Sequence, residues 1–584
     1  IDMSTGKICC LVLLTLGVLA VAVTLVVILT QPKCGPQRYL HGAVAADTET
    51  CSLIGRNILK SGGTAVDAAI AGLICTSVMN PQSSGLGGGV VFTIYNASTG
   101  TVEVINARET VPREFPHNLL SGCGPGFPVG PRWIAVPGEL RGYEEAHKRY
   151  GRLPWKALFE PTIKLLSEPL TISRVMENII HHPLFSTPGK SLCPLLCDGQ
   201  RFLRYGETFR WPALQQTLRA VAEHGATAFY DGQIGNALVE DIRKAGSSLS
   251  LEDLQMYKAE VSSALNITLN NHTTVFAPGP PLGGAVLMFI LKVLEEYKFH
   301  EASLAIPQEK VETYHRIAEA LKFGNMLRPH MSDPDFSKAQ VTVGAMLSDK
   351  IADRVRHQID ARGDHPLNHY NLLESIYNDK YKSMGTSHIS VLAADGSAVS
   401  ATSTINYPFG SFVYSNQTGI ILNNELADFC MANRSINPGE PSHPQNKAQA
   451  QEMERLILLA SALGEKPPSA MVPSILISKT GDMLVIGGAG GAWIISATTM
   501  AIINKLWFGY DLEHAISAPV MHTDGDNVLF EEHFSEEVRT GLLGRGHKEK
   551  KDKFAMNVVQ GISKEGKCIS AYSDKRKLGK SAGY

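Results

Sequence analysis

The apolar positions of the chain are most concentrated near its N-terminal end, where one stretch contains no charged side chain. Residues 8–30 read ICCLVLLTLGVLAVAVTLVVILT. A run of about 20 apolar residues can cross a bilayer as a helix, whereas the apolar part of a cleaved signal peptide has only about 7–15 residues. We therefore expect residues 1–7 to form a short cytoplasmic tail and residues 8–30 an uncleaved transmembrane anchor, followed by an ectodomain.

Beyond this run, helical and strand patterns alternate. Residues 51–78 have a helical pattern, in which Thr64 and Asp67 are spaced as a capping box before an apolar run. The segments VVFTIYN and TVEVINA are rich in β-branched residues and flank a Ser-Thr-Gly turn, which predicts two strands. Helix-like stretches with Pro/Gly breaks fill residues 140–380, and apolar strands such as MLVIGG follow after residue 385. This mixture predicts α/β or α+β layers.

The composition excludes several classes of protein. Lys and Arg number 54 against 56 Asp and Glu, and the net charge of -2 provides no basic surface for nucleic acid. With 44% hydrophobic and 19% charged residues, the chain is neither disordered nor collagen-like. Its 584 residues would suggest about four domains of about 150 residues each.

The cysteines and the glycosylation triplets indicate the compartment. Cys51 and Cys75 lie on two expected helices, and Cys193 and Cys197 are four positions apart. We expect a disulfide within each pair, which an oxidising compartment favours. A metal site is the alternative for the second pair, although no second set of closely spaced ligands accompanies it. Five Asn-X-Ser/Thr triplets are candidate glycosylation sites, at Asn96, Asn266, Asn271, Asn416 and Asn433.

The charges that flank the apolar run do not decide its orientation. Lys7 precedes the run, and Lys33 and Arg38 follow it. The cysteines and triplets do decide it, because both belong outside the cytosol. We therefore expect a single-pass type II protein of the plasma membrane with an extracellular ectodomain.

The segment that carries chemistry begins at Gly385. Residues 385–391 read GTSHISV and continue through AADGSAVSATSTIN to Asn406; taken alone, they predict a half-buried β-hairpin. The stretch resembles the start of the small subunit of γ-glutamyltransferases (glutathione hydrolases), whose proenzyme cuts itself before a threonine. Further segments recur in that family in the same order, namely SGLGGG (84–89), NARET (106–110), PGE (137–139), NNELADF (423–429), GGAGG (487–491), LWFGYD (506–511) and the terminal AGY.

The resemblance implies the α+β fold of the N-terminal nucleophile hydrolases, an αββα sandwich formed as one large domain. It also implies cleavage between Gly385 and Thr386. The ectodomain would then consist of a large subunit (31–385) and a small catalytic subunit (386–584) that form a heterodimer. Thr386 becomes the N-terminal nucleophile, and its new α-amine, with a pKa of about 8, can act as the base that its hydroxyl needs.

The same resemblance assigns the groups that assist the nucleophile. Thr404 lies beside Thr386 and supports its hydroxyl. The backbone N–H groups of Gly490 and Gly491 form the oxyanion hole, since glycine permits close approach of the backbone. Without the family, GGAGG would be read as a tight turn after a strand.

The substrate groups require charges of both signs. A γ-glutamyl donor carries an α-carboxylate and an α-ammonium group. The resemblance assigns the carboxylate to Arg108, which can bind it through two hydrogen bonds, and to Ser469. It assigns the ammonium group to Asn406, Glu425 and Asp428. Without the family, Arg108 would be read as a surface ion pair and Asp428 as a loop or cap residue.

Position 470 departs from the family's usual pattern. Many relatives carry two adjacent serines here, whereas this chain has Ser469 followed by Ala470. A hydrogen bond to a charged group contributes about 1.5–3 kcal/mol. The missing hydroxyl therefore predicts weaker capture of the substrate, unless water or Arg108 compensates.

The implied reaction cleaves the γ-glutamyl bond of glutathione and its S-conjugates and passes the acyl group to water or to an acceptor amino acid or dipeptide. It needs no cofactor, and the sequence contains no recognisable metal-ligand set. The segments INARETVP, MVPSILI and VIGGAGG resemble one vertebrate subtype, which adds leukotriene C4 to the donors. The alternatives are a related acylase with a neutral acyl pocket and an uncleaved, catalytically silent surface interaction protein on the same scaffold.

The register of the 385–406 hairpin decides which side chains share a face with Thr386. A two-residue turn at Asp395-Gly396 would pair residue 386 with 405 and send Thr404 to the opposite face. A three-residue turn at residues 395–397 with a bulge would pair 386 with 406. We predict the second register, because it places Thr386, Thr404 and Asn406 on one face.

Overall fold

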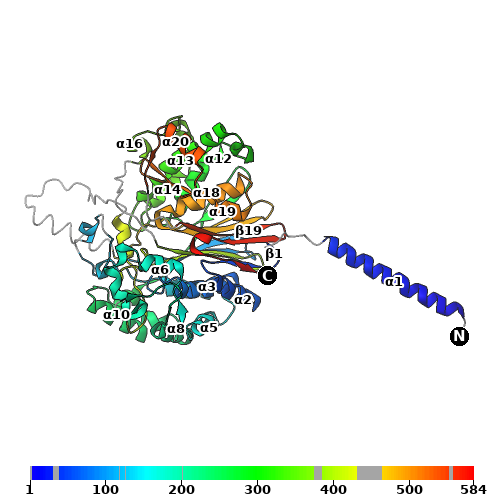
Figure 1. Ribbon diagram of the computed structural model, residues 1–584, viewed down its shortest axis with the longest axis horizontal. Coiled ribbons are helices and arrows are strands. Elements are labelled where there is room, and N and C mark those ends of the chain that lie inside the picture. Colours follow the sequence, from blue (N-terminus) through cyan, green and yellow to red (C-terminus); the bar gives the residue numbers. More distant parts are fainter. Residues whose placement is uncertain are drawn as a thin grey trace, which may run out of the picture.

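The computed structural model describes residues 3–30, 38–116, 119–124, 127–199, 201–373, 385–430, 463–551 and 557–584. In these parts of the chain, two stacked β-sheets lie between two layers of helices (Figure 1). Residues before and after Gly385 contribute strands to both sheets, so the two predicted subunits share one fold. The four domains suggested by the length alone are not formed.

The first sheet contains the predicted nucleophile hairpin. It is antiparallel and has seven strands, in the spatial order β21 (Ala582–Gly583), β2 (Ala43–Ala45), β12 (Ser387–Leu392), β13 (Ala398–Thr404), β3 (Gly89–Asn96), β4 (Thr101–Ala107) and β9 (Glu260–Ser263).

The second sheet packs against the first. It is also antiparallel with seven strands, in the order β1 (Arg38–Tyr39), β20 (Cys568–Ser573), β19 (Val558–Glu565), β15 (Met483–Ala489), β14 (Ser474–Ile477), β11 (Thr274–Ala277) and β10 (Leu265–Thr268). Contacts of β12 and β13 with β15 join the two sheets at the centre.

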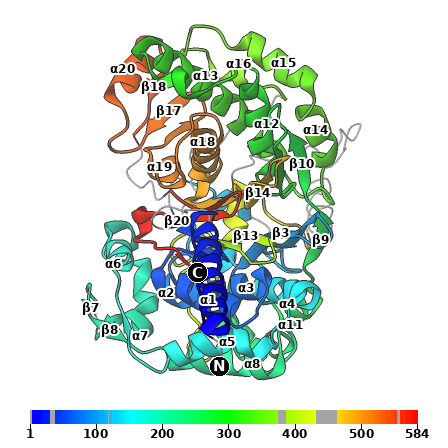
Figure 2. The same cartoon turned by 90° about the vertical axis from the view of Figure 1, so that its right-hand side faces the viewer.

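Helices cover the outer face of each sheet (Figure 2). The first sheet is covered by α2 (Glu49–Lys60), α3 (Ala65–Met79) and α4 (Glu139–Tyr150), with α5 (Trp155–Leu165) and α8 (Pro212–His224) behind them. The second sheet is covered by α12 (Gly284–Glu295), α18 (Ile494–Leu506) and α19 (Leu512–Ser517), with α13 (Pro307–Asn325) and α20 (Glu536–Gly544) outside. Each outer face has its own large apolar core, whereas the apolar cluster between the sheets is small.

Shorter elements complete the described fold. The helices are α6 (Arg174–Ile180), α7 (Cys193–Leu196), α9 (Thr227–Tyr230), α10 (Gln233–Lys244), α11 (Leu251–Met256), α14 (Ala339–Met346), α15 (Asp349–Gln358) and α16 (Leu367–Tyr370). The strands are β5 (Leu170–Thr171), β6 (Cys197–Asp198), β7 (Arg201–Phe202), β8 (Thr208–Phe209), β16 (Met521–Asp524), β17 (Asn527–Phe530) and β18 (Lys548–Glu549).

The space between the sheets is largely polar near the hairpin. Successive side chains of a strand point to opposite faces. In β12, Ile389 and Val391 pack in the apolar core between the first sheet and its helices. Ser390 faces the second sheet and donates to the carbonyl of Gln560 (3.2 Å). In β13, Ser400 donates to the carbonyl of Ile486 (2.9 Å). Ser390 and Ser400, which share this inner face with Thr386, therefore connect the two sheets by hydrogen bonds.

Several local predictions are confirmed. Thr64 and Asp67 form the capping box that begins α3, and VVFTIYN and TVEVINA form β3 and β4. The structure joins Cys51 of α2 to Cys75 of α3, and it joins Cys193 to Cys197. Of the predicted glycosylation sites, Asn266, Asn271 and Asn416 are exposed and Asn96 is half-buried, whereas Asn433 lies outside the described residues.

The predicted register of the nucleophile hairpin is wrong by two residues. Ser387 pairs with Ser403 and Leu392 with Ala398, which sets residue 386 opposite residue 404 and not 406. The loop is a three-residue type, as expected, but it covers residues 394–396. Such a loop needs a left-handed residue at its third position, and only Gly396 (φ 86°) meets that need. Thr386 and Thr404 still share a face, while Asn406 lies beyond the strand.

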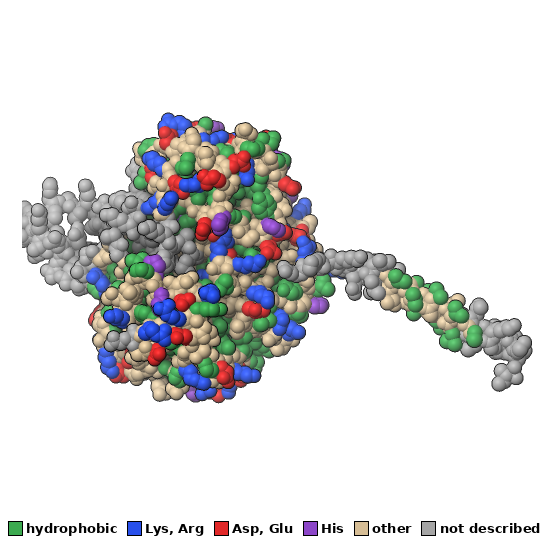
Figure 3. All heavy atoms as spheres, in the orientation of Figure 1, with side chains coloured by type: hydrophobic (Ala, Val, Ile, Leu, Met, Phe, Trp, Pro, Cys, Tyr) green, Lys and Arg blue, Asp and Glu red, His purple; other side chains and the backbone are tan. Residues whose placement is uncertain are grey.

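Helix α1 (Met3–Thr30) projects away from the layered part of the molecule, and its described side chains are exposed (Figure 3). Among the residues that the structure describes, none of the helices has both the length and the apolarity needed to span a bilayer. The transmembrane assignment of residues 8–30 therefore remains a prediction.

Candidate active site

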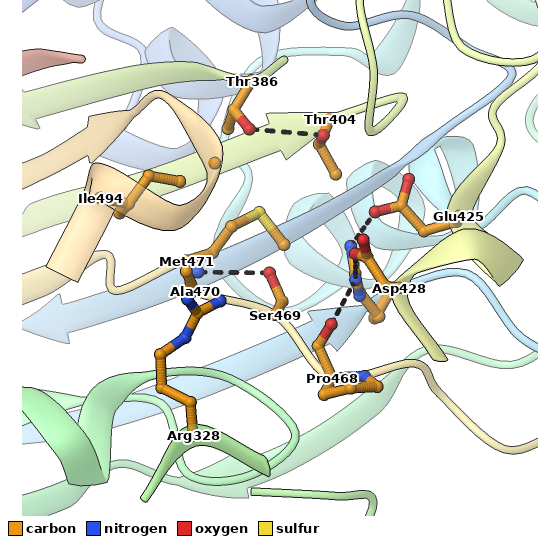
Figure 4. A pocket seen from close by; sticks show the side chains of 12 residues that line it. Arg328, Thr386, Thr404, Glu425, Asp428, Pro468, Ser469, Ala470, Met471 and Ile494 are labelled. Carbon is orange, nitrogen blue, oxygen red and sulfur yellow. Dashed lines mark hydrogen bonds and ion pairs between the residues drawn. The ribbon is translucent and has the colours of Figure 1, made fainter. Parts of the chain in front are cut away.

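The two threonines of the hairpin lie side by side at its open end. The hydroxyl oxygens of Thr386 and Thr404 are 3.5 Å apart (Figure 4). Both side chains are buried, at 3% and 2% exposure. The backbone N–H of Asn406 donates to Thr404 Oγ1 (2.8 Å), which orients that hydroxyl. The sequence prediction that Thr404 lies beside Thr386 agrees with this geometry.

The peptide bond before Thr386 is intact in this structure. Thr386 Oγ1 contacts the carbonyl oxygen of Gly385, and Thr404 Oγ1 donates to the same oxygen (2.9 Å). A donor on a carbonyl oxygen polarises the carbonyl carbon toward attack. On the other side, the Lys577 ammonium donates to the Thr386 carbonyl and forms an ion pair with Asp47 (3.2 Å). The peptide bond at which cleavage is predicted is thus flanked by hydrogen-bonding groups on both of its sides.

Arg108 is buried directly after β4, and two carboxylates and two backbone carbonyls bind its guanidinium. Its Nη1 and Nη2 bind Glu425 and Asp428, both on the 3-10 segment Glu425–Cys430 (η7). Its Nε and Nη2 also donate to the carbonyls of Pro467 and Pro468, each at 3.0 Å. The hydrogen bonds fix the guanidinium, which is 1% exposed.

The carboxyl groups around Arg108 outnumber its single charge. Glu109 lies 3.7 Å from the guanidinium and is a third carboxyl group beside it. Burial raises the pKa of Glu425, although Arg108 opposes the shift, and burial together with Glu425 raises the pKa of Glu109 well above its usual range. Burial raises the pKa of Asp428 to about 6, again against the effect of Arg108. An added cation would therefore be stabilised beside this acidic group.

A pocket opens between the threonines and the Arg108 cluster (Figure 4). About 310 Å³ of empty space lies in and at the mouth of this pocket, part of it open to solvent. Five of the predicted substrate and catalytic residues besides Thr386 and Thr404 line it; the full lining is Arg108, Arg328, Thr386, Thr404, Glu425, Asp428, Pro468, Ser469, Ala470, Met471, Gly491 and Ile494. Asn406 and Gly490 lie outside this lining. Asn406 donates through its amide to the carbonyl of Asn424 (3.1 Å), directly before Glu425.

The predicted oxyanion-hole segment joins β15 to α18. Gly490 and Gly491 both have positive φ angles, 119° and 58°. Residues with a Cβ rarely adopt a φ of 119°, so this sharp exit from β15 requires glycine at Gly490. The turn brings Gly491 to the pocket wall, at the start of the 3-10 segment Gly491–Trp493 that leads into helix α18.

Sequence reasoning missed several residues of this region. Arg328 lines the pocket from the short 3-10 segment Arg328–His330, and Lys577 reaches Thr386 from the C-terminal segment. No local motif marks Arg328, which merely precedes a proline. A third disulfide joins Cys123 to Cys430, the last residue of η7. A sequence separation of 307 positions hides this pair from any pattern search.

A group of potential metal ligands lies elsewhere, in the helical layer over the second sheet. His315, Glu319 and His547 are buried, with ligand atoms within 4.8 Å of one another. The Lys322 ammonium already lies among them, 2.9 Å from His547 Nδ1 and 3.2 Å from Glu319 Oε1. Tyr370 donates to Glu319 as well (2.9 Å). Lys322 thus supplies the positive charge of this buried network, and we assign the network a structural role.

Comparison with protein-family models matches residues 51–584 to the family described as Gamma-glutamyltranspeptidase. The chain belongs to this family. It is 48% identical to the human protein named Glutathione hydrolase 5 proenzyme over 583 residues, which cover 98% of each chain. The mouse protein of the same name is also 48% identical, and Glutathione hydrolase 3 of Arabidopsis thaliana is 32% identical over 93% of this chain and 87% of its own.

The solved structures agree with the family fold. The crystal structure of cephalosporin acylase from Bacillus halodurans has a TM-score of 0.78 and 23% sequence identity, covering 95% of this chain and 99% of its own. At 23% identity, this similarity supports the fold alone. Membership of the γ-glutamyltranspeptidase family makes this chain an enzyme of γ-glutamyl hydrolysis or transfer, and it agrees with the subtype resemblance of the sequence segments.

Proposed function

We propose that this protein is a self-cleaving membrane ectoenzyme that removes the γ-glutamyl group from glutathione and glutathione S-conjugates. The observation that carries the proposal is the position of Thr386 Oγ1 against the Gly385 carbonyl, at the wall of a pocket that combines Arg108 with Glu425 and Asp428. One threonine would serve first in self-cleavage and then as the enzyme's nucleophile.

Self-cleavage begins with attack of Thr386 Oγ1 on the Gly385 carbonyl carbon. The C–N bond of the peptide breaks, the ester forms, and the former amide nitrogen takes up a proton to become the α-amine of Thr386. Thr404 stabilises the oxyanion of this step, since its hydroxyl donates to the Gly385 oxygen (2.9 Å). Water then hydrolyses the ester, which releases Gly385 as a carboxylate and frees the Thr386 hydroxyl.

In the catalytic cycle, the new α-amine accepts the proton of the Thr386 hydroxyl as that oxygen attacks the γ-carbonyl of the donor. The backbone N–H groups of Gly490 and Gly491 stabilise the resulting oxyanion, and the amine leaves with a proton. Water, or the amino group of an amino acid or dipeptide, then attacks the γ-glutamyl-threonine ester. The products are free glutamate or a new γ-glutamyl compound.

The donor's charged end would lie in the Arg108 region. The α-ammonium group fits Glu425 and Asp428, whose raised pKa values reflect carboxylates in need of a cation. Ser469 lies at the same wall, and its Oγ accepts from the Met471 N–H (3.2 Å), which leaves its hydroxyl proton directed elsewhere for a carboxylate. Asn406 would act by holding the carbonyl of Asn424, one residue before Glu425.

The donor class and the location follow from the relatives and the N-terminal run. The relatives named glutathione hydrolase 5 support glutathione as a donor. Its S-conjugates, leukotriene C4 among them, are proposed from the subtype that the segments INARETVP, MVPSILI and VIGGAGG resemble. The apolar run 8–30 supports a type II anchor that holds the pocket outside the cell, and the word proenzyme in those names supports a two-subunit product.

A denaturing gel and an activity assay test the proposal together. Purified protein should separate under reducing conditions into two species, the smaller beginning at Thr386, and Thr386→Ala should remain a single species. The cleaved protein should release glutamate from glutathione and from leukotriene C4. A single intact species without this activity would instead support the silent interaction protein, and cleavage without either activity would support a related acylase.

A further inference from the structure

Arg328 is a cation of the pocket without a partner among the described residues. Its side chain lines the pocket beside Ser469 and Ala470 (Figure 4), yet it makes no hydrogen bond or ion pair there, and its buried Nε has no acceptor. Burial lowers the pKa of Arg328 to about 10, against the opposing effect of Asp428 and Asp524. Arg328 is half-buried, and a guanidinium partly withdrawn from water without a counter-ion loses solvation free energy that a bound anion would recover.

Arg108 differs from Arg328 in this respect. Its guanidinium already binds two carboxylates and two backbone carbonyls. A carboxylate of the donor bound at Arg108 would therefore share that guanidinium with the Glu425 and Asp428 carboxylates. A second cation in the same pocket would compensate for the shared positive charge.

We propose that Arg328 receives a carboxylate of the γ-glutamyl donor, on the side of the pocket where Ala470 offers no hydroxyl. The inference rests on the proposed function. Glutathione has two carboxylates within reach of such a group, the α-carboxylate of its glutamyl part and that of its glycine. Either one would form charge-assisted hydrogen bonds with the guanidinium.

A donor with one carboxylate and a donor with two carboxylates together show which carboxylate binds Arg328. γ-Glutamyl-p-nitroanilide carries only the α-carboxylate, whereas glutathione carries both. In cleaved protein, Arg328→Gln should raise KM about 10- to 100-fold, the factor expected for a lost hydrogen bond to a charged group, with a smaller change in kcat. A rise with both donors assigns the α-carboxylate, and a rise with glutathione alone assigns the glycine carboxylate.

Two variants serve as controls. Arg316→Gln on α13 removes another half-buried arginine, which pairs with Glu312 (2.8 Å) and lies outside the pocket lining, and it should leave both KM values unchanged. Arg328→Lys keeps the charge and should raise KM by a smaller factor. This variant provides the KM measurement if Arg328→Gln does not fold. Unchanged KM values for both donors in either cleaved Arg328 variant would overturn the inference.

Failure of the proposed function is seen separately in the unmodified protein. If the unmodified protein acts on neither donor, calorimetry with glutamate, which carries the α-carboxylate and the ammonium group, tests Arg328 directly. Weaker glutamate binding to Arg328→Gln supports the inference, and equal binding counts against it.

An independent observation concerns the disulfide between Cys123 and Cys430. Cys123 follows the short segment Leu119–Gly122 (η1) of the predicted large subunit, and Cys430 ends η7 of the predicted small subunit. The cleavage point at Gly385 lies between them in sequence. Around the bond, Leu119, Trp133 and Phe429 form a compact apolar cluster with Leu426 and Ala427 of η7.

We infer that this disulfide links the two subunits covalently after cleavage and positions η7 at the pocket. Cys430 lies two residues after Asp428 on the segment that holds the Arg108 partners. Loss of the bond would remove the covalent anchor at the end of η7. The expected result is a rise in KM for the donor with little change in kcat.

Gel mobility tests the link in a Cys568→Ser background, because Cys568 is itself disulfide-bonded. That variant should migrate as one species without reductant and as two with dithiothreitol, which is oxidised to its cyclic disulfide while two protein thiols form. Adding Cys430→Ser should give two species in both conditions and raise KM. Two species from Cys568→Ser without reductant would refute the link.

A matched control removes the Cys193–Cys197 disulfide, which lies within the predicted large subunit. The paired substitutions Cys193→Ser and Cys197→Ser should change neither the number of species nor KM. If no variant is cleaved, the proposed function fails, and peptide mapping of the non-reduced chain then decides whether the Cys123–Cys430 bond exists.

Discussion

His388 of strand β12 packs directly on Gly487 of strand β15, so closely that a Cβ atom at position 487 would lie 2.2 Å from His388 Cε1. His388 lies two residues after Thr386, and Gly487 lies three residues before Gly490. The imidazole is held by Thr402 Oγ1 (2.8 Å) and Ser390 Oγ (3.0 Å), and burial lowers its pKa to about 3, so it is neutral near physiological pH. This contact sets the spacing between the nucleophile strand and the strand of the predicted oxyanion hole.

Gly487→Ala should therefore separate the two central strands. Overpacking of a buried site costs about 1–3 kcal/mol, which should appear in the free energy of unfolding measured with denaturant. The reduced fit should also slow self-cleavage. Adding His388→Ala removes the ring that clashes, so the double variant should recover part of the stability lost in Gly487→Ala; equal or greater loss in the double variant would contradict the packing account.

Removal of the Thr404 hydroxyl should slow self-cleavage. Thr404→Ala deletes the donor on the Gly385 oxygen, and loss of one oxyanion donor typically costs about 100-fold in rate. Thr404→Ser keeps the hydroxyl and should cleave at nearly the rate of the unmodified chain. A time course on reducing gels measures both rates, and indistinguishable rates for alanine and serine would remove Thr404 from the reaction.

Ala470→Ser should strengthen capture of the donor. Ala470 is 5% exposed and lines the pocket next to Ser469, so a hydroxyl there would face the bound carboxylate. A hydrogen bond of about 1.5 kcal/mol corresponds to a KM roughly 10-fold lower. Steady-state kinetics with a γ-glutamyl substrate provide the measurement, and unchanged constants would show that position 470 does not contact the donor.

Donor affinity should fall in acid. The ammonium group of the donor pairs with the ionised form of Asp428, whose pKa is raised to about 6 by burial. Below that pH the protonated form predominates, so KM should rise as the pH falls through about 6 and stay level above it. Asp428→Asn should have a high KM with a weaker pH dependence over the same range. A KM of the unmodified enzyme that stays constant from pH 7 to 5 would exclude Asp428 as the ammonium partner.

Local features of the fold were predictable because they depend on neighbours a few residues apart. The capping box of Thr64 and Asp67 and the strands β3 and β4 follow from short-range hydrogen bonding and side-chain alternation. The hairpin register was not predicted correctly, although the three-residue type of its turn was. Its prediction put glycine in the middle of the loop, whereas the left-handed position is the third residue, Gly396.

The main residues of the candidate site could be predicted from the sequence, whereas their contacts could not. Family segments identified Thr386, Thr404, Arg108, Glu425 and Asp428, and the structure brings all five to one pocket. Their partners could not be read from a pattern. Arg108 meets Glu425 across 317 positions and Lys577 meets Thr386 across 191, distances over which no periodicity extends.

The sequence by itself determined that strands and helices form layers, and it determined the residues of the nucleophile hairpin and the family to which they belong, since each depends on short contiguous segments. Only the tertiary structure decided that Arg108 binds Glu425 and Asp428 while Arg328 has no partner among the described residues, that His388 packs on Gly487, and that Cys123 meets Cys430. These relationships arise when the two sheets stack and bring distant segments together. Packing and charge pairing act between neighbours in space, and the chain order does not record them.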